Sequence, residues 1–389
     1  MRSGASKRAA HAAFSLTNAV AVLPDRVEET TLVVRDGLIH RINAVHATAA
    51  RRIDCGHDYL LPGLIELHTD NLEKHLEPRP GTFWDTDRAV LSHDAELATA
   101  GITTAFDAVT LGGDAGDAER EKAYLGAIDS LESAASQGLL RIQHELHLRC
   151  ELGSPRLADY FKAATRSHRP GLISLMEHVP GQGQWRDVER FRRHYARRYN
   201  LSVSELDALI ARRKHNQERF SADNRSQAIA MARHHDSVLA SHDDSVPQDV
   251  EHAAQSGCTI VEFPTSLAAA HQARALGMQV LAGAPNYVRG GSHSGNVSAA
   301  DLLANGVVDI LSSDYCPSSL LQAVFSMARN AIAPLHGAVA MASSHPARAS
   351  RLNDRGSIVE GLRADLIRVR DTAHGPIVIN AWCGGRQVA

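Results

Sequence analysis

The segment with the clearest chemical potential is an apolar, strand-like run, residues 60–67, which leads into His68 and Asp70. Successive side chains of a strand point to opposite faces, so two residues two positions apart share a face. A neutral imidazole and a carboxylate are both suitable ligands for zinc or manganese. This pair alone is only a weak indication of a metal site.

Other apolar strand-like runs are followed by four more residues with ligand chemistry: Glu151, His178, His242 and Asp314. Taken singly, such residues are more often core histidines or helix-capping carboxylates. Six of them at strand ends predict a divalent metal centre. Two metals bridged by Glu151 and a hydroxide would need about this many ligands, and Asp314 would accept the hydroxide proton. Glu177 and Asp243, each beside a proposed ligand, remain alternatives.

Eight strand-like runs separated by helical patterns must position these residues: 60–67, 101–107, 146–152, 172–176, 237–241, 259–263, 278–282 and 308–312. Eight strands that alternate with helices over roughly 290 residues favour an α/β fold of the (β/α)8 TIM-barrel type over a doubly wound sheet. Barrels of this type carry their chemistry at the carboxyl ends of the strands, where the six residues are expected.

Both ends of the chain carry β patterns. Residues 31–34 and 38–43 flank an Asp-Gly turn that is typical of a hairpin, and strand-like runs return at 364–369 and 377–382. Neither end is long enough to bury its own core. We therefore predict a small β-sandwich domain from residues 14–60 and 350–389, beside a barrel of residues 61–349.

Residues 185–220 are helical in pattern and contain ten Arg or Lys against five Asp or Glu. They predict a helical insertion after the fourth barrel strand. A solvated helix face or an oligomer contact explains this composition as well as a grip on a polyanionic substrate does.

Composition narrows the functional classes. The 389 residues have a net charge of -3 and a pI near 6.7, so any attraction for anions must be local, and neither nucleic acid nor a membrane is an expected partner. No apolar run reaches the roughly 18 residues of a membrane span, and residues 1–13 lack the apolar stretch of a secretory signal, so we expect a cytoplasmic protein. The five cysteines are widely spaced, which argues against a disulfide framework.

The chain resembles the amidohydrolase superfamily in residues 62–68, Pro-Gly-Leu-Ile-Glu-Leu-His, and in the Gly-rich signature 356–366 that ends in Ala-Asp-Leu. Within the superfamily it is similar to the PhnM family of triphosphate diphosphatases over nearly the whole sequence from about Thr31. The motifs that carry this second resemblance lie at 66–74, 78–80, 92–95, 147–152, 241–244, 283–286, 288–296 and 312–315.

The resemblance implies hydrolysis of α-D-ribose 1-methylphosphonate 5-triphosphate to the 5-monophosphate and pyrophosphate, a step of the carbon-phosphorus lyase pathway. It also implies one or two divalent ions (zinc, manganese or iron) held by His68, Asp70, Glu151, His178, His242 and Asp314. The chain departs from the superfamily where His-x-Asp replaces the usual His-x-His, which makes the first site harder in ligand character. No lysine ends the fourth strand, so Glu151 is the expected substitute for a carbamylated bridge.

A triphosphate ester would bring about four negative charges, and its pocket would need cations and backbone donors. The candidate cations are Lys74, Arg79, Arg149 and Arg289, although Lys74 also fits a surface helix face. The turn 290–296 offers Ser292 and Ser294, with His293 as an acid for the leaving group, or is an ordinary flexible loop. His93, beside an expected helix start, would bind phosphate or only cap the helix.

Two other functions fit the same sequence. A deaminase or N-acyl hydrolase that acts on a carbon centre would need a more apolar pocket with fewer arginines. An inactive scaffold of a phosphonate-processing complex would not need six intact ligand positions. The expected substrate is a small molecule, and a homo-oligomer is compatible with the sequence.

Overall fold

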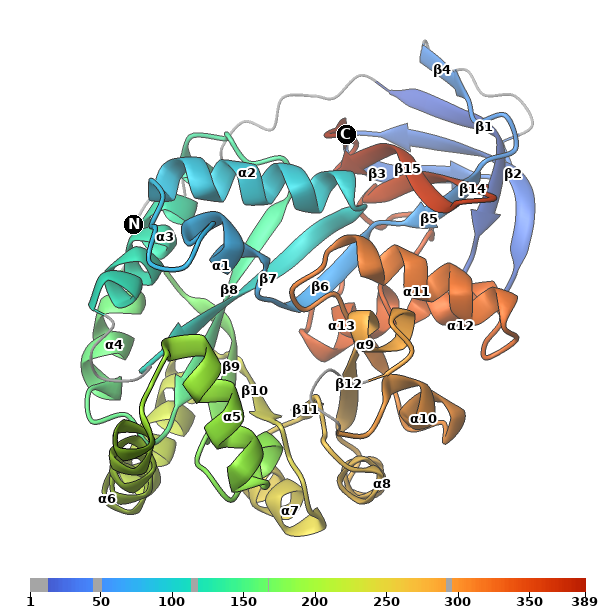
Figure 1. The fold of residues 1–389 in the computed structure, drawn as a ribbon. Coiled ribbons are helices and arrows are strands. Elements are labelled where there is room, and N and C mark those ends of the chain that lie inside the picture. The colour runs from blue at the N-terminus through green and yellow to red at the C-terminus, as the bar shows by residue number, and fades with distance from the viewer. Residues whose placement is uncertain (1–12, 45–50, 113–117, 167, 292–295) are drawn as a thin grey trace.

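The protein is described by a computed structural model that covers residues 13–44, 51–112, 118–166, 168–291 and 296–389. It contains two eight-stranded sheets, one parallel and one mixed. Figure 1 shows that strands from the two ends of the chain share the mixed sheet beside the parallel one.

The parallel sheet contains its strands in chain order: β6 (Leu64–Thr69), β7 (Ile102–Leu111), β8 (Gln143–Glu151), β9 (Pro170–Met176), β10 (Val238–His242), β11 (Ile260–Glu262), β12 (Gln279–Gly283) and β13 (Ile310–Ser312). A parallel bridge between Thr69 and Asp314 connects the chain after β13 to the end of β6. This arrangement confirms the predicted (β/α)8 barrel.

Helices surround the barrel: α1 (Asn71–Leu76), α2 (Thr86–Thr99), α3 (Ala118–Ser136), α4 (Leu157–Ala164), α7 (Pro247–Gln255), α8 (Leu267–Ala275), α9 (Ala284–Val288), α10 (Ala299–Ala304), α11 (Ser318–Arg329), α12 (Leu335–Ala340) and α13 (Ser344–Ala349). Apolar side chains such as Leu67, Phe106 and Leu281 fill the barrel interior. Within the described ranges, no helix combines the length and apolar character that a membrane span requires.

The small sheet combines strands from both ends of the chain: β1 (Phe14–Val22), β2 (Val27–Arg35), β3 (Leu38–Ile42), β4 (Arg51–Asp54), β5 (Tyr59–Pro62), β14 (Leu366–Thr372), β15 (Gly375–Cys383) and β16 (Arg386–Gln387). It buries a cluster of its own, in which the rings of Phe14 and Trp382 stack with centroids 5.9 Å apart. The expected small β domain is thus confirmed. Its boundary at residues 60 and 350 stays a prediction.

The strand expected at 60–67 is divided between the two sheets. Leu60 and Leu61 lie in β5 and pair with β14, whereas the barrel strand begins at Leu64. Gly63 joins them: its N–H donates to the Asp365 carbonyl of the small domain, and the next residue donates to Gly101 at the base of the barrel. One apolar run therefore serves two sheets, which residue periodicity could not reveal.

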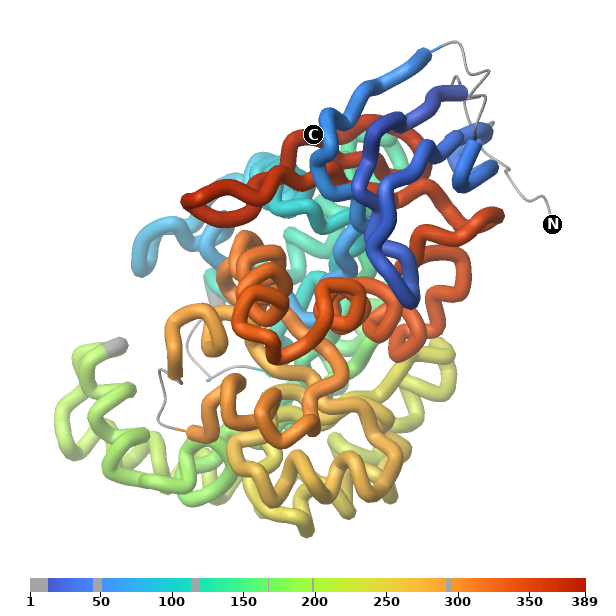
Figure 2. Tube along the Cα trace, turned by 90° about the vertical axis from the view of Figure 1, so that its right-hand side faces the viewer, coloured from blue at the N-terminus to red at the C-terminus, as the bar shows by residue number. Residues whose placement is uncertain are grey.

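The expected insertion consists of a 3-10 turn, η1 (Gly183–Trp185), and two helices, α5 (Val188–Tyr199) and α6 (Val203–His235). A capping box between Ser202 and Glu205 starts α6. The first half of α6 packs on α5 around a separate cluster of Trp185, Phe191, Leu209 and Ile210, while its second half joins the core that covers the barrel. In Figure 2 the green α5–α6 hairpin extends sideways from the rest of the molecule.

The close approach at Gly63 gives the first prediction. A Cβ at this position would lie 2.2 Å from Thr103 Oγ1 and 2.8 Å from its Cβ, and Thr103 is buried. Gly63→Ala should therefore lower the free energy of unfolding in urea by about 3 kcal/mol. In the control Gly337→Ala, inside α12, the nearest atoms lie 3.5 Å away, and we expect a gain of up to about 1 kcal/mol. Equal effects of the two substitutions would contradict the close-packing explanation.

Candidate metal centre

Three histidines meet at the carboxyl ends of the barrel strands. His68 lies at the end of β6, His242 ends β10, and His178 follows β9 by two residues. The rings of His68 and His242 stack with centroids 5.2 Å apart, and the ring of His178 meets His242 edge-on at 5.7 Å. The barrel therefore brings together three of the six predicted ligands.

Asp243 supplies a carboxylate between two of these rings. Its Oδ2 lies 3.5 Å from His178 Nε2 and 3.5 Å from His242 Nε2. Ligand atoms of the three residues all lie close enough to hold one metal ion. Asp243 has a φ of 60°, so the chain turns directly after β10 and directs this side chain to the centre. The sequence left Asp243 as an alternative, and the geometry favours it.

Glu151 contacts His178 through both oxygens. Oε1 accepts a hydrogen bond from the backbone N–H of His178 at 3.0 Å, and Oε2 lies 2.8 Å from His178 Nδ1. Burial opposes a charge on His178, but the carboxylates of Glu151 and Asp243 raise its pKa to about 9. Glu151 therefore orients His178 with Nε2 toward Asp243, and its expected role as a bridge between two metals stays a prediction.

Glu262, at the end of β11, was missed by the sequence reasoning. Its fully buried carboxylate lies 3.2 Å from His242 Nδ1 and 3.1 Å from His68 Nδ1, and it accepts a hydrogen bond from Ser174 at 2.6 Å. Burial opposes its ionisation, yet His68 and His147 hold the pKa of Glu262 well below its usual range. Carboxylates in this position fix the tautomer of a metal-binding imidazole. The only signal in the sequence was a charged residue within the apolar run 259–263.

Asp70 forms an ion pair with Arg149. The guanidinium donates from Nη1 to Asp70 Oδ1 at 2.7 Å, and its Nη2 lies 3.4 Å from His242 Nε2. Asp70 Oδ1 is 3.7 Å from His68 Nε2. Arg149 therefore lies among the predicted ligands, although the sequence placed it with the substrate-binding cations.

Asp314 is held close to Asp70 at the junction of β13 and β6. The backbone N–H of Asp70 donates to the Asp314 carbonyl at 3.0 Å. Burial raises the pKa of the Asp314 carboxyl well above its usual range, and the charge of Asp70 adds to this effect. The buried carboxylate of Glu66 fixes both neighbouring strands, because it accepts hydrogen bonds from the His68 N–H at 2.7 Å, the Ser312 hydroxyl at 2.7 Å and the Ser313 N–H.

One buried atom of this centre fits a cation. Considering the described residues alone, Asp243 Oδ2 is buried without a hydrogen bond and faces the Nε2 atoms of His178 and His242, whereas His68 Nδ1 and Glu262 Oε1 face each other at 3.1 Å. Unpaired buried polar atoms are costly, and imidazole nitrogen and carboxylate oxygen are ligands of zinc and similar divalent ions. The donor set therefore matches the predicted kind of cofactor.

The other predicted substrate-binding residues are spread around this region. Lys74 on α1 is half exposed, with its ammonium 2.7 Å from Glu96 on α2. Arg79, after α1, and Arg289, which caps α9, are exposed. Ser292, His293 and Ser294 lie outside the described residues.

His93 lies inside α2 and is fully buried, not at a helix start as expected. Its Nε2 is 2.7 Å from Asp107 Oδ1, and the second oxygen of Asp107 lies 2.7 Å from His144 Nδ1. His144 Nε2 is 3.3 Å from Asp94. These residues form an internal ion-pair network between α2, β7 and β8, and His93 is enclosed within it.

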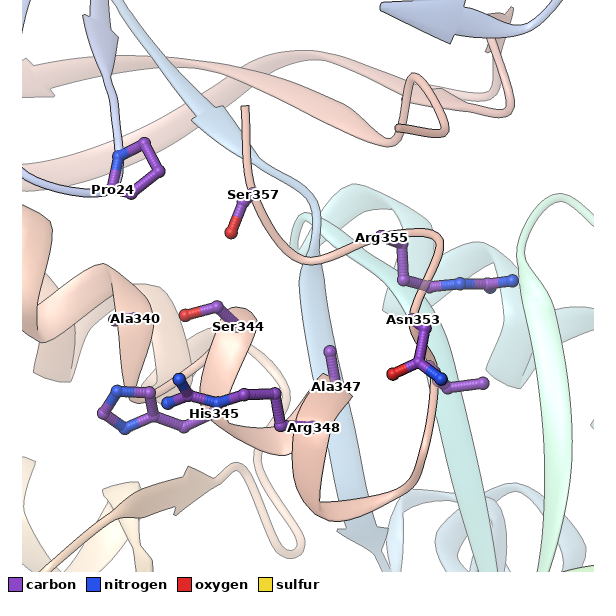
Figure 3. A pocket seen from close by; sticks show the side chains of 10 residues that line it. Pro24, Ala340, Ser344, His345, Ala347, Arg348, Asn353, Arg355 and Ser357 are labelled. Carbon is purple, nitrogen blue, oxygen red and sulfur yellow. The ribbon is translucent and has the colours of Figure 1, made fainter. Parts of the chain in front are cut away.

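A cavity of about 370 Å³ lies elsewhere, against α13. Figure 3 shows that Ser344, His345 and Arg348 line it from α13, with Pro24 from the turn between β1 and β2 above them. Ala347 of α13 also packs against residues at the starts of the strands, such as Ile260 and Ile310, so this cavity is at the amino-terminal end of the barrel. It contains none of the predicted site residues.

The chain belongs to the amidohydrolase family. The model of the Amidohydrolase family matches residues 197–388. The chain is also 39% identical to the alpha-D-ribose 1-methylphosphonate 5-triphosphate diphosphatase of Escherichia coli (strain K12), over 96% of this chain and 99% of that protein. The expected family is thus confirmed, and the chain is a hydrolase.

Solved structures with the same fold are much more distant in sequence. N-acetylglucosamine-6-phosphate deacetylase from Pasteurella multocida superposes with a TM-score of 0.60 at 13% identity, covering 96% of this chain and 99% of that one. A D-hydantoinase from Bacillus sp. AR9 has a TM-score of 0.61 at 12% identity, covering 97% and 95%. At these identities they support the fold alone.

The internal network predicts a pH-dependent stability. Burial opposes a charge on His144, but Asp107 and Asp94 raise its pKa to about 10. In the folded protein the pKa of His144 lies above the unfolded value of about 6.5, so the protonated imidazole stabilises the fold. This stabilisation is complete below a pH of about 6.5 and is lost as the pH rises through about 10. His144→Gln should therefore lower the free energy of unfolding by about 3 kcal/mol at pH 7. This difference from wild type should shrink between pH 7 and pH 10.

Urea unfolding at pH 7, 8.5 and 10 measures this difference. His234→Gln, at an exposed position near the end of α6, is the control and should show no such trend. A deficit of His144→Gln that stays constant with pH would show that His144 is not stabilised as a cation.

Proposed function

We propose that this hydrolase converts α-D-ribose 1-methylphosphonate 5-triphosphate to the 5-phosphate and pyrophosphate. The observation that carries the proposal is the 39% identity to the Escherichia coli diphosphatase over 96% of this chain and 99% of that protein. The mouth of the barrel, with buried imidazoles, carboxylates and a guanidinium, is compatible with this chemistry.

One or two divalent ions would be held by groups at the barrel mouth. His178, His242 and Asp243 form the first candidate site, and His68 and Asp70 form the adjoining part, where Arg149 lies. Such an ion would lower the pKa of water and so supply a hydroxide nucleophile at neutral pH. Glu151 and Glu262 would orient the imidazoles of His178 and His242. Each carboxylate lies within hydrogen-bonding distance of an Nδ1 atom and leaves Nε2 facing the centre.

Asp314 is the proposed acceptor of the proton from the attacking water. Its backbone, with φ of 52°, places it at the turn after β13, and Glu66 fixes that turn through Ser312 and Ser313. Burial raises the pKa of the Asp314 carboxyl, and a divalent ion bound nearby would lower it again, so that the ionised carboxylate could accept the proton.

Arg149 is the proposed group that faces the α-phosphoryl oxygens. Its charge is held at the centre by Asp70, and a guanidinium can bind two phosphate oxygens at once. Exposed Arg79 and Arg289 are the proposed contacts of the outer phosphates, and His293 is the proposed acid for the leaving group.

Phosphorus NMR of the ribose phosphonate triphosphate with manganese- or zinc-loaded enzyme tests the proposal, with ATP as a competing substrate. We expect pyrophosphate and the 5-phosphate from the phosphonate ester. His242→Ala and Asp314→Asn should lower kcat by more than about 100-fold, since both groups contact the reacting centre. His271→Ala, on an exposed face of α8, is the control and should keep full activity. Full activity of His242→Ala would refute the proposed site, and turnover of ATP alone would refute the substrate.

A further inference from the structure

The α5–α6 hairpin contacts the segment that carries His178. Four residues of α6 spaced four positions apart, Arg213, Gln217, Ser221 and Arg225, all reach Glu177 or His178; we call them the α6 row. Residues four apart on a helix lie above one another on one side, so a continuous row can grip a single short segment.

The contacts of the α6 row are specific. Arg213 Nη1 donates to the carbonyl of His178 at 2.9 Å. Gln217 Nε2 donates to Glu177 Oε2 at 3.1 Å, the hydroxyl of Ser221 donates to Glu177 Oε1, and the guanidinium of Arg225 lies 3.4 Å from the same oxygen. Both carboxylate oxygens of Glu177 are thereby engaged by α6.

The same helix holds the neighbouring strand end. Asn224, a buried residue of α6, donates from Nδ2 to the carbonyls of Leu152 at 2.8 Å and Ser154 at 2.7 Å. Leu152 directly follows Glu151, the carboxylate that orients His178, and Ser154 lies two residues further along the chain. Helix α6 therefore fixes both partners of the Glu151–His178 pair from outside the barrel.

Arg213 also links this contact to the packing of the hairpin. Its guanidinium lies over the ring of Tyr195 at 4.6 Å and over Phe191 at 5.2 Å, and Nη2 donates to the Tyr195 hydroxyl at 2.8 Å. Phe191 belongs to the cluster that joins α5 to α6. The hairpin thus has its own core, and that core sets the direction of the guanidinium that holds His178.

We infer that the α6 row is a positioning device for the metal centre and that Arg213 sets the place of His178 within it. The inference rests on the proposed metal-binding role of His178. No residue of the row is offered as a ligand or as a group that contacts substrate. Its effect is on the affinity of the centre for its ion, because a displaced imidazole loses part of its coordination geometry.

The experiment measures the dissociation constant of Zn²⁺ by competition with a chromophoric chelator, on the full-length protein. Arg213→Met should weaken the His178-dependent site by about 10-fold or more, the range for loss of a group that orients a metal ligand. Arg213→Lys, which keeps one donor, should recover part of this loss. The activity of Arg213→Met should rise toward that of wild type with added metal, with KM unchanged.

Arg212→Met is the matched control, because Arg212 is the exposed neighbour on the same helix. It should keep the wild-type dissociation constant. Ser221→Ala removes the hydroxyl that donates to Glu177 and should weaken Zn²⁺ binding several-fold. This variant replaces Arg213→Met as the test if thermal unfolding shows that Arg213→Met does not fold.

The outcomes separate this inference from the proposed function. His178→Ala identifies the site in the wild-type protein. If wild-type protein holds no ion that His178→Ala removes, both proposals are overturned. If it does, but folded Arg213→Met and Ser221→Ala bind Zn²⁺ within twofold of wild type, the positioning role alone is overturned.

Discussion

The arrangement of side chains at the mouth of the barrel depends on how the negative charges of its carboxylates are balanced by neighbouring groups. Glu262 is fully buried and Asp70, Asp243 and Asp314 are partly buried, and an ionised carboxylate without a partner is costly in such a place. Arg149 compensates Asp70, the imidazoles of His68 and His242 lie within hydrogen-bonding distance of Glu262, and burial raises the pKa of Asp314. A divalent cation beside Asp243 would complete the same balance, which is why we propose a metal site here.

Orientation of the imidazoles follows from that compensation. Glu262 lies beneath His68 and His242, and Glu151 lies beside His178, so carboxylates face the Nδ1 atoms while Nε2 atoms face Asp70 and Asp243. The strands supply these positions because carboxyl ends of a parallel barrel converge. Helix α6 adds a second layer of support from the hairpin. The proposed metal ligands, the carboxylates that contact them and the outer helix thus form one continuous set of contacts.

Much of the fold could be predicted because apolar runs and turns are local signals. Each of the eight runs overlaps a barrel strand. The run 60–67 was predicted as one strand, but the chain passes from one sheet to the other at Gly63. This break depends on hydrogen bonds to Asp365 and Gly101, which are distant in sequence.

The site could be predicted less completely. His68, His178 and His242 do meet, but strand periodicity does not extend through the turn at Asp243, where φ is positive, so the sequence could not decide which residue faces the centre. The role of Glu262 could not be predicted, because the sequence does not show which histidines a carboxylate in an apolar strand will contact. The place of His93 in an internal network could not be predicted for the same reason. Its partner Asp107 and the next residue of the network, His144, lie on strands that are distant in sequence.

The most direct test of a metal centre at the barrel mouth is anomalous X-ray diffraction at the zinc edge from crystals grown with Zn²⁺. The account predicts an anomalous peak within coordination distance of His178 Nε2, His242 Nε2 and the Asp243 carboxylate. A peak only between His93, Asp107 and His144, a buried group with ligand chemistry that lies away from these residues, would contradict it. So would fully occupied surface sites with none at the mouth.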